Sequence, residues 1–401
     1  MPPRTTLENL PPWLILMGSL AAIGPLAVDM YLPSFPAIAA DLGVAQGLVE
    51  QTLASYLLGL ALAQLCYGPL ADRYGRKFPL LGGLTLFVVA SLGCATAATI
   101  DQLALWRIVQ AFGGAAGMVI PRAVIRDHLE TRDAAKALSL LMLVMGVMPI
   151  LAPLLGAQAL LLGSWRTIFH IMAAVGILQW LAVAVSMRES LDPEHAAALT
   201  PRVIAANYAD LLRHKAFMGY ALAGGFGSAG LFAYISGSPR VFIVIYGIEP
   251  QYFGLLFGLN AAALIAASQL GARLLNRHTP ATLLARALRG MVLAALAALL
   301  LTAAGLITLP LLMLCLMGFM ASLGFVGPNA AALALAEQGR RLGVASALMG
   351  GLQMLCGAAS GLAISAWHTD TPLPLAGILA LCATMAWLSG HAAARAAAHA
   401  A

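Results

Sequence analysis

Long apolar runs recur along the whole chain, and this repetition limits the possible folds more than any other feature of the sequence. Each run approaches or exceeds the 20 or so apolar residues that a helix needs to cross roughly 30 Å of hydrocarbon. Membrane β-strands are only about ten residues long and alternate apolar with polar positions, so runs of this length indicate helices. We expect twelve spans, at residues 12–33, 48–71, 78–99, 102–125, 138–162, 167–187, 216–237, 252–274, 281–305, 308–331, 342–366 and 374–394.

Charged side chains are scarce in this sequence. They make up 9% of the 401 residues, whereas 61% are hydrophobic. A soluble domain carries about 25% charged residues, and a water-exposed surface this apolar would aggregate. The apolar run from Trp13 has no small-residue cleavage site after a short hydrophobic region, so we expect an uncleaved first span. The composition therefore predicts an all-α polytopic membrane protein.

Lys and Arg residues indicate the orientation of the spans. If the N-terminus is cytoplasmic, then of the 22 basic residues only Arg107, Arg166 and Arg240 fall outside cytoplasmic segments. Both termini are therefore expected in the cytoplasm. The net charge of +6 does not indicate nucleic-acid binding, because no basic cluster is interleaved with aromatic residues.

A polar stretch at residues 188–215 divides the predicted spans into two sets of six. The halves echo each other weakly, since DRYGRK follows the second span and RLLNRH follows the eighth. Two bundles facing a central cavity are a recurring transporter plan. We expect an N-terminal bundle at 1–187, a cytoplasmic linker at 188–215 and a C-terminal bundle at 216–401. One chain is large enough to form a complete carrier, so a monomer is expected.

The segment between the second and third spans combines two glycines, one carboxylate and three cations. It reads Gly68-Pro-Leu-Ala-Asp72-Arg73-Tyr-Gly75-Arg76-Lys77. We interpret it as a tight turn in which the glycines permit close approach. Its carboxylate suits a neighbouring helix N-terminus, and its cations suit helix C-termini and anionic lipid. These charged residues can stabilise one conformation of the protein through contacts that another conformation lacks. A generic positively charged loop is the alternative.

This segment matches the signature G-x-L-a-D-r-x-G-r-k of the major facilitator superfamily at every specified position, and the chain resembles that family over nearly its whole length. The first span ends in DMYLPSFP, which looks like the opening of the bicyclomycin-resistance branch of multidrug exporters. The C-terminal half resembles the same branch in GYALAGGFGSAGLFAYISGSP and FVGPN. The resemblance implies two six-helix bundles that work by alternating access as a drug:proton antiporter of the bacterial inner membrane.

Two further segments resemble family elements with small departures. LALWRIVQ in the fourth span is similar to R-x-x-q-G, with Ala111 in place of glycine. MPILAPLLGA in the fifth span resembles the antiporter motif G-P-x-x-G-G, with Ala152 and Ala157 in place of two glycines. Arg122, Arg126 and Asp127 lie at the end of the fourth span. They could act in gating or in ion pairs, or their charges could simply set the orientation of the span. The candidate gating residues are Gly68, Asp72, Arg73, Gly75, Arg76, Lys77, Arg122, Arg126, Asp127, Pro149, Pro153 and Gly156.

Asp29 and Arg107 are charged residues inside predicted spans. A charge at the centre of a membrane helix costs roughly 2.5–3.5 kcal/mol on the insertion scale, so it usually faces a cavity or a partner. Asp29 lies about 25 Å along its helix and Arg107 about 8 Å into its own, which places both in the periplasmic half. Desolvation raises the pKa of a carboxyl group, whereas a nearby cation lowers it. We predict that Asp29 carries a proton and that Arg107 adjusts its binding; a static pair is the alternative.

Aromatic, thioether and amide side chains within the spans are candidates for a substrate cavity. Aromatic and Met surfaces suit varied apolar ligands, and intramembrane amides can bind substrate or bridge helices. Helix packing is the alternative role for each of them. The candidate substrate-binding residues are Tyr31, Phe35, Phe226, Phe232, Tyr234, Asn260, Gln353 and Met354.

The sequence does not indicate an enzyme. Its five cysteines lie singly in apolar runs and its histidines are scattered, so neither a metal site nor a nucleophilic triad is expected. No Walker-type phosphate loop is present, and we expect the proton gradient as energy source with no cofactor. The proposal from the sequence is export of small amphipathic drugs. Proton-coupled metabolite uptake and a non-transporting membrane protein are the alternatives.

Overall fold

The structure, a computed structural model, describes residues 11–129, 131–190, 201–336, 338, 342–367 and 369–400, and the statements below concern these residues. This part of the chain is helical and contains no strand. Twelve of its helical segments are long and apolar enough to cross a membrane. They run over Pro12–Leu42, Gln46–Tyr74, Lys77–Ala95, Ile100–His128, Leu143–Leu162, Arg166–Ser186, Lys215–Ile245, Pro250–Leu274, Pro280–Ala303, Leu309–Leu335, Val344–Ala366 and Leu373–Ala397.

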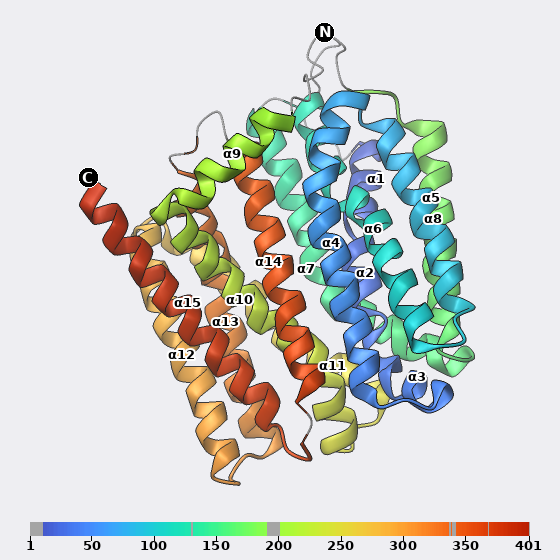
Figure 1. The fold of residues 1–401 in the computed structure, drawn as a ribbon, viewed down its shortest axis with the longest axis vertical. Coiled ribbons are helices and arrows are strands. Elements are labelled where there is room, and N and C mark those ends of the chain that lie inside the picture. The colour runs from blue at the N-terminus through green and yellow to red at the C-terminus, as the bar shows by residue number, and fades with distance from the viewer. Residues whose placement is uncertain are drawn as a thin grey trace. The chain divides into compact units, whose positions relative to one another are not determined.

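Figure 1 labels most of the helices that build these spans. In chain order the elements are α1 (Pro12–Ala21), α2 (Ile23–Asp29), the short 3₁₀ turn η1 (Leu32–Ser34), α3 (Phe35–Leu42), α4 (Gln46–Tyr74), α5 (Lys77–Ala95), α6 (Ile100–His128), α7 (Thr131–Leu162), α8 (Arg166–Ser186), α9 (Pro201–Arg213), α10 (Lys215–Pro239), the π-helical segment η3 (Arg240–Ile245), α11 (Pro250–Leu274), α12 (Pro280–Ala303), α13 (Leu309–Leu335), α14 (Leu342–Ala366) and α15 (Leu373–Ala400).

Each predicted span coincides with one of these helical segments, which confirms the all-α, twelve-span fold class. The predicted end of the first span at residue 33 is wrong. Prolines at 33 and 36 occupy the first turns of η1 and α3, where a missing N–H group is tolerated, so the helical path continues. It ends at Gly43, whose φ of 65° lies in the left-handed region typical of a helix C-terminus.

The chain divides into two compact units. Unit 1 holds residues 1–43 and 55–199, and unit 2 holds residues 44–54 and 200–401. Helix α4 therefore begins in unit 2 and continues in unit 1. The predicted boundaries at 187 and 216 stay a prediction, since residues 191–200 of the predicted linker lie outside the described residues.

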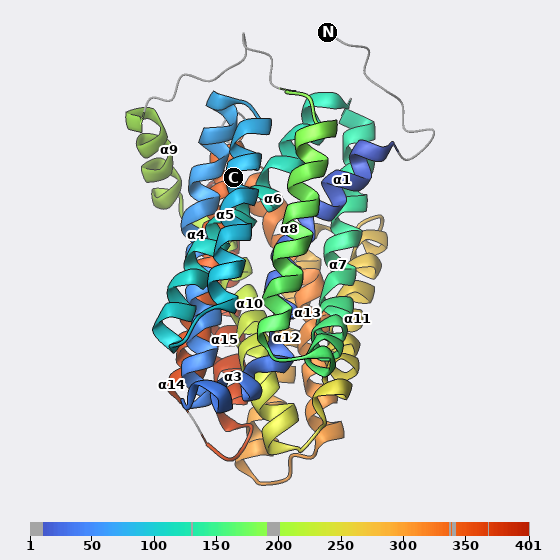
Figure 2. The same cartoon turned by 90° about the vertical axis from the view of Figure 1, so that its right-hand side faces the viewer.

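Small residues allow close helix packing in unit 1. Helix α5 packs against both α6 and α8, while α1 packs against α6, α7 and α8 (Figure 2). A side chain at Gly113 of α6 would collide with the backbone of Phe87 in α5, and Gly83 of α5 meets Ala116 of α6 in the same way. Glycine at these two sites lets the helix backbones approach, as in many membrane bundles.

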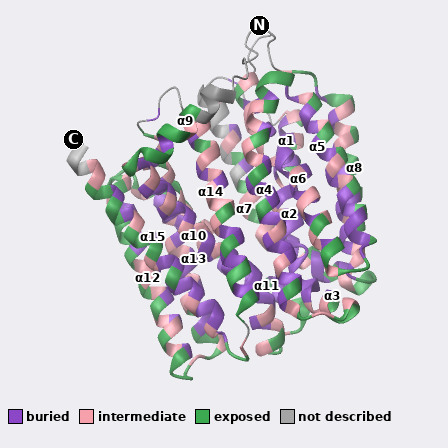
Figure 3. Cartoon of the chain, in the orientation of Figure 1, coloured by how far each residue is buried: buried purple, intermediate pink, exposed green. Residues whose placement is uncertain are grey.

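Unit 2 is built around α10, which packs against α13, α14 and α15. Gly230 of α10 fits against the ring of Phe319 in α13, and Gly357 of α14 fits against Phe232 of α10. Many large apolar side chains lie on the outside of both units, including Val185, which is 87% exposed (Figure 3). Such faces suit a hydrocarbon solvent.

Candidate functional site

Asp29 is a buried carboxyl group in unit 1. It ends α2, its residue is 3% exposed, and its Oδ1 atom has no hydrogen-bond partner among the described residues. Helix α2 packs against α6 and α7. A side chain at Gly156 of α7 would collide with the carbonyl oxygen of Met30, so this glycine brings α7 against the backbone next to Asp29. The predicted antiporter segment and the predicted proton carrier therefore pack together.

Arg107 of α6 also lies in unit 1, and its side chain is fully buried. Its guanidinium lies over the rings of Tyr56 and Tyr31, with the Cζ atom 4.2 and 4.7 Å from the ring centroids. Its Nη1 donates to the backbone oxygen of Ala27 (3.0 Å) and to Oε1 of Gln110 (2.6 Å). Its Nε and Nη2 have no partner in the described part of the chain. Aromatic faces and neutral oxygens thus surround this cation.

Gln110 extends the polar contacts from Arg107 into α5. Its Nε2 donates to the hydroxyl of Ser91 (2.8 Å), which in turn donates to the backbone oxygen of Phe87 (2.7 Å). A buried polar chain of this kind fixes the orientation of the groups that it joins. Gln110 therefore holds Arg107 in one position.

The structure brings Asp29 and Arg107 together without pairing them. Within the described residues no ion pair joins their side chains, although Arg107 donates to the carbonyl of Ala27, two residues before Asp29. Tyr56 of α4 lies within electrostatic range of both charged groups. Sequence reasoning missed Tyr56, because a single tyrosine in an apolar run carries no signal of its own. The three side chains form what we call the Asp29 cluster.

The signature segment forms an ion-pair network in unit 1. Arg76 Nη1 contacts Asp72 Oδ1 (2.5 Å), and Arg76 Nε contacts Asp127 Oδ2 (3.0 Å), which also accepts from the hydroxyl of Ser190 (2.9 Å). Burial alone lowers the pKa of Arg76, but its hydrogen bonds with Asp127 and Asp72 raise this pKa above its ordinary value. The guanidinium therefore keeps its charge while it joins the end of α4 to the end of α6.

Glu189 completes this network from the segment after α8. Its carboxylate accepts from the backbone N–H groups of Arg76 (2.7 Å) and Lys77 (3.1 Å) at the start of α5. A helix N-terminus favours a negative charge. Lys77 Nζ also donates to the backbone oxygen of Ala184 in α8 (2.9 Å). From the sequence, we expected the carboxylate of the signature segment to lie at a helix N-terminus. Glu189, which lies at the start of α5, was not predicted.

The two signature glycines differ in their roles. Gly75 has a φ of 87° and forms the turn between α4 and α5, and the carboxylate of Glu189 occupies the space that a side chain would need. Gly68 lies inside α4 with open space around its α-carbon. The predicted close approach at Gly68 is therefore wrong, because the helix continues to Tyr74 and the turn is shorter than expected.

Other candidate gating residues lie outside the network. Arg73 is exposed and its Cζ lies 5.3 Å from the ring centroid of its neighbour Tyr74. Arg122 Nη2 contacts the sulfur of Met145 (3.8 Å), and Arg126 is exposed. Both candidate prolines lie within α7, where Pro153 is buried and Pro149 is half-buried.

The candidate substrate residues of unit 1 pack on each other. Tyr31 and Phe35 are fully buried, and their ring centroids are 4.9 Å apart with an edge-to-face geometry. Tyr31 also covers the Arg107 guanidinium. Tyr31 therefore contacts the Asp29 cluster and is also a member of the candidate substrate set.

The candidate substrate residues of unit 2 fall into buried and half-buried groups. Tyr234 stacks on Phe257 at 5.1 Å. Asn260 Nδ2 donates to the backbone oxygen of Leu256 (3.1 Å) and contacts the sulfur of Met313 (3.5 Å), which indicates a packing role. Phe232 is buried against α14. The half-buried members are Phe226, Gln353 and Met354.

A second buried carboxyl group, Glu50, lies in unit 2. It stands near the start of α4, and the charge of Arg240 acts on it. Arg240 is the first residue of the π-helical segment η3 and donates through Nη2 to the backbone oxygen of Thr369 (3.3 Å). Single π-helical turns occur often at functional sites. Sequence reasoning missed Glu50 because it lies two residues inside the predicted start of a span.

A model of the Major Facilitator Superfamily matches residues 17–361. The uncharacterized MFS-type transporter YdgK of Bacillus subtilis is 40% identical over 346 residues, which are 85% of each chain. A bicyclomycin resistance protein homolog of Haemophilus influenzae is 32% identical over 387 residues, 94% of each chain. The multidrug resistance protein MdtL of Klebsiella pneumoniae is 31% identical over 345 residues, 86% of each chain. In fold, the chain is similar to a peptide transporter POT in complex with sulfate, with a TM-score of 0.76, 15% identity and coverage of 99% of this chain and 96% of that one.

Proposed function

Because the chain belongs to the Major Facilitator Superfamily, and is thus a multi-pass membrane transporter and not an enzyme, we propose that it exports small amphipathic drugs in exchange for protons. The names of its bicyclomycin-resistance and multidrug-resistance relatives support drugs as the substrate class. The proposed location is the bacterial inner membrane, with both termini in the cytoplasm. The proposed energy source is the proton gradient, and no cofactor is required.

The Asp29 cluster carries this proposal. An ionised Asp29 attracts the nearby Arg107 cation, whereas a protonated Asp29 does not, and in a dry interior this difference is large. The free Oδ1 of Asp29 and the free Nη2 of Arg107 can engage each other when the charge on Asp29 changes. Proton binding thereby changes the energy of α2 relative to α6. A transporter can use such a change to favour one conformation over another.

The signature network has a proposed role as a conformational latch. Asp72, Arg76, Asp127 and Glu189 join α4, α5, α6 and the segment after α8 through charge-assisted hydrogen bonds. A network of this kind holds its helix ends together only in the conformation in which all its members meet. We assign substrate contact to Phe226, Gln353 and Met354, which are half-buried in unit 2.

The direction of flux tests export against proton-coupled uptake. In inside-out vesicles, acidifying the lumen drives a proton-exchanged drug inward, whereas a symported substrate does not accumulate. We expect the acidified vesicles to take up at least one antibiotic from a chemically diverse panel to which expression of the protein confers resistance. Export is ruled out if expression confers resistance to these antibiotics but the acidified vesicles take up none of them.

A further inference from the structure

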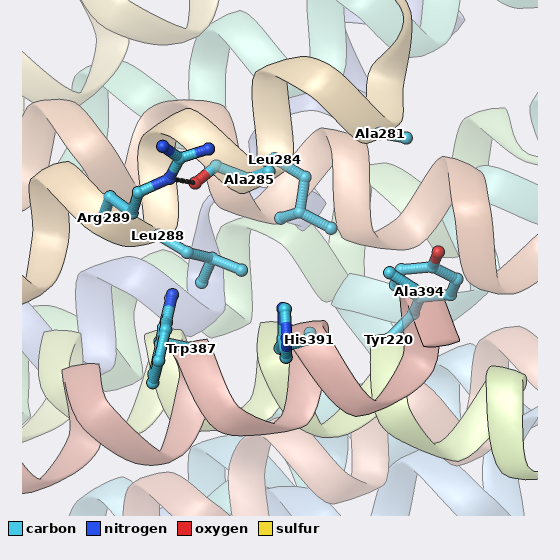
Figure 4. Close-up of a pocket in the computed structure, with 10 residues that line it drawn as sticks. Tyr220, Ala281, Leu284, Ala285, Leu288, Arg289, Trp387, His391 and Ala394 are labelled. Carbon is cyan, nitrogen blue, oxygen red and sulfur yellow. Dashed lines mark hydrogen bonds between the residues drawn. The ribbon is translucent and has the colours of Figure 1, made fainter. Parts of the chain in front are cut away.

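Unit 2 contains a cavity of about 340 Å³ between α10, α12 and α15 (Figure 4). Its walls are mostly apolar and include Leu284 and Leu288 of α12, with alanines and a glycine beside them. Polar groups come from Arg289 of α12, from Trp387 and His391 of α15, and from Tyr220 of α10. The cavity thus combines an apolar pocket with a few polar groups, the composition typical of a binding site.

The cavity lies at one end of the helices of unit 2. Arg289 comes nine residues after the start of α12 and His391 nine residues before the end of α15, each about 14 Å from its helix end. Lys and Arg residues gather at this end, which the distribution of basic residues predicts to be cytoplasmic. The Nε atom of Arg289 reaches back to the backbone oxygen of Ala285, five residues after the start of α12, so the guanidinium lies about 8 Å from that helix end. Helices of 24 to 28 residues are about 36 to 42 Å long and exceed the roughly 30 Å of hydrocarbon, so this depth is close to the boundary between lipid chains and head groups.

Arg289 is an exposed cation at this depth without an anionic partner. Its Nε donates to the backbone oxygen of Ala285 (3.2 Å) in its own helix, and within the described residues no carboxylate pairs with it. An arginine at the edge of the hydrocarbon needs either water or an anion. Its remaining N–H groups can form the paired hydrogen bonds that phosphate oxygens accept.

Trp387 and His391 form the opposite wall. Their rings are stacked, with centroids 5.8 Å apart and an interplanar angle of 16°, and they project from α15 toward α12 (Figure 4). Trp387 comes fourteen residues after the start of α15, near the middle of that helix, so its ring lies deeper in the membrane than that of His391. Leu288 lies between this wall and Arg289 and offers a surface for a lipid chain.

From these observations we infer that the cavity binds an anionic phospholipid of the surrounding bilayer. Arg289 contacts the phosphate, the head group lies toward His391, and an acyl chain lies along Leu288 and Trp387, which are deeper in the membrane. Basic pockets between helices at the cytoplasmic side of a membrane recognise such head groups. A free phosphate fits less well, because it would leave the apolar walls in contact with water.

Native mass spectrometry of the purified full chain tests this inference. The protein is titrated with phosphatidylglycerol and, separately, with phosphatidylcholine of the same chain length. We expect one phosphatidylglycerol to bind at least about tenfold more tightly than phosphatidylcholine. Arg289→Gln should weaken phosphatidylglycerol binding about tenfold, which is the loss of about one charge-assisted contact. The matched control is Arg286→Gln, an exposed arginine of the same helix that does not line the cavity, and it should change binding less than twofold.

Two further arms separate the alternatives. Ala285→Phe fills the apolar part of the cavity without changing its charge and should also weaken phosphatidylglycerol binding. Inorganic phosphate at millimolar concentration should not displace the lipid. Equal binding of both lipids, unchanged binding in Arg289→Gln, or displacement by phosphate overturns the inference. A single monodisperse species and an unchanged melting temperature confirm that each variant is folded. None of these readouts depends on drug transport.

Discussion

Arg107 is held by shape as much as by charge. Its planar group fits between the rings of Tyr31 and Tyr56 while Nη1 contacts two oxygens. A lysine keeps the charge but has neither the planar face nor the fork of donors. Transport should therefore depend on the position and hydrogen bonding of the cation as well as on its charge.

We predict that Arg107→Lys lowers proton-driven drug transport at least about tenfold, a loss of about 1.4 kcal/mol. The measurement is the initial transport rate in proteoliposomes at several external pH values. The pH profile should also change, because the cation that acts on Asp29 has moved. Arg213→Lys, at an exposed site at the end of α9, is the control and should keep both rate and profile. Wild-type rate and profile in Arg107→Lys would contradict the role given to this side chain.

Arg76 should not contribute to the pH dependence of transport. Its folded-state pKa is raised above an already high ordinary value, so the guanidinium loses its proton only at strongly alkaline pH. The stabilisation from this cation is fully present below that range. A change of transport rate at lower pH must therefore come from other groups, and the Asp29 cluster is our candidate.

At the scale of helices, Gly156 sets the distance between α7 and the segment that carries Asp29. Its α-carbon faces the Met30 carbonyl oxygen, and this contact leaves no space for a methyl group. Overpacking of a close helix contact typically costs 1–3 kcal/mol.

We predict that Gly156→Ala lowers the melting temperature and reduces transport several-fold, because α7 must move away from Met30. Gly82→Ala is the matched control, since Gly82 lies in α5 with open space around its α-carbon. The measurements are thermal unfolding in detergent and transport by the same protein samples. Equal melting temperatures and rates for the two variants would show that the close contact does not constrain the helix.

Helix α4 begins in unit 2 and continues in unit 1, and the charge of Arg240 acts on Glu50 in its first part. We predict that Glu50→Gln and Arg240→Gln each lower the melting temperature, and that the double variant loses less than the sum of the two. Such non-additivity measures a direct interaction. Additive losses in this cycle would mean that Glu50 and Arg240 do not interact.

At the scale of the molecule, the sequence predicted the twelve spans because each one needs its own long apolar run. It also indicated Asp29 and Arg107, since a charge inside such a run is costly and stands out. Glu189 could not be found in this way: its hydrogen bond joins residues 113 positions apart, and nothing in a local pattern reports such a contact. Tyr56 escaped for the same reason, because its place beside Arg107 depends on how α4 and α6 pack. Packing of this kind is a property of the folded chain.

Proton exchange through Asp29 is the central step of the proposed transport. The direct measurement is drug-dependent proton flux into proteoliposomes, followed with a pH-sensitive dye, using an antibiotic from the resistance panel. The control is Asp101→Asn, an exposed carboxyl group at the start of α6, which should behave as wild type. Asp29→Asn should lose the drug-dependent proton flux at least about tenfold, equivalent to about 1.4 kcal/mol. Proton flux in Asp29→Asn equal to that of wild type, with the same drug, would show that Asp29 does not carry the exchanged proton.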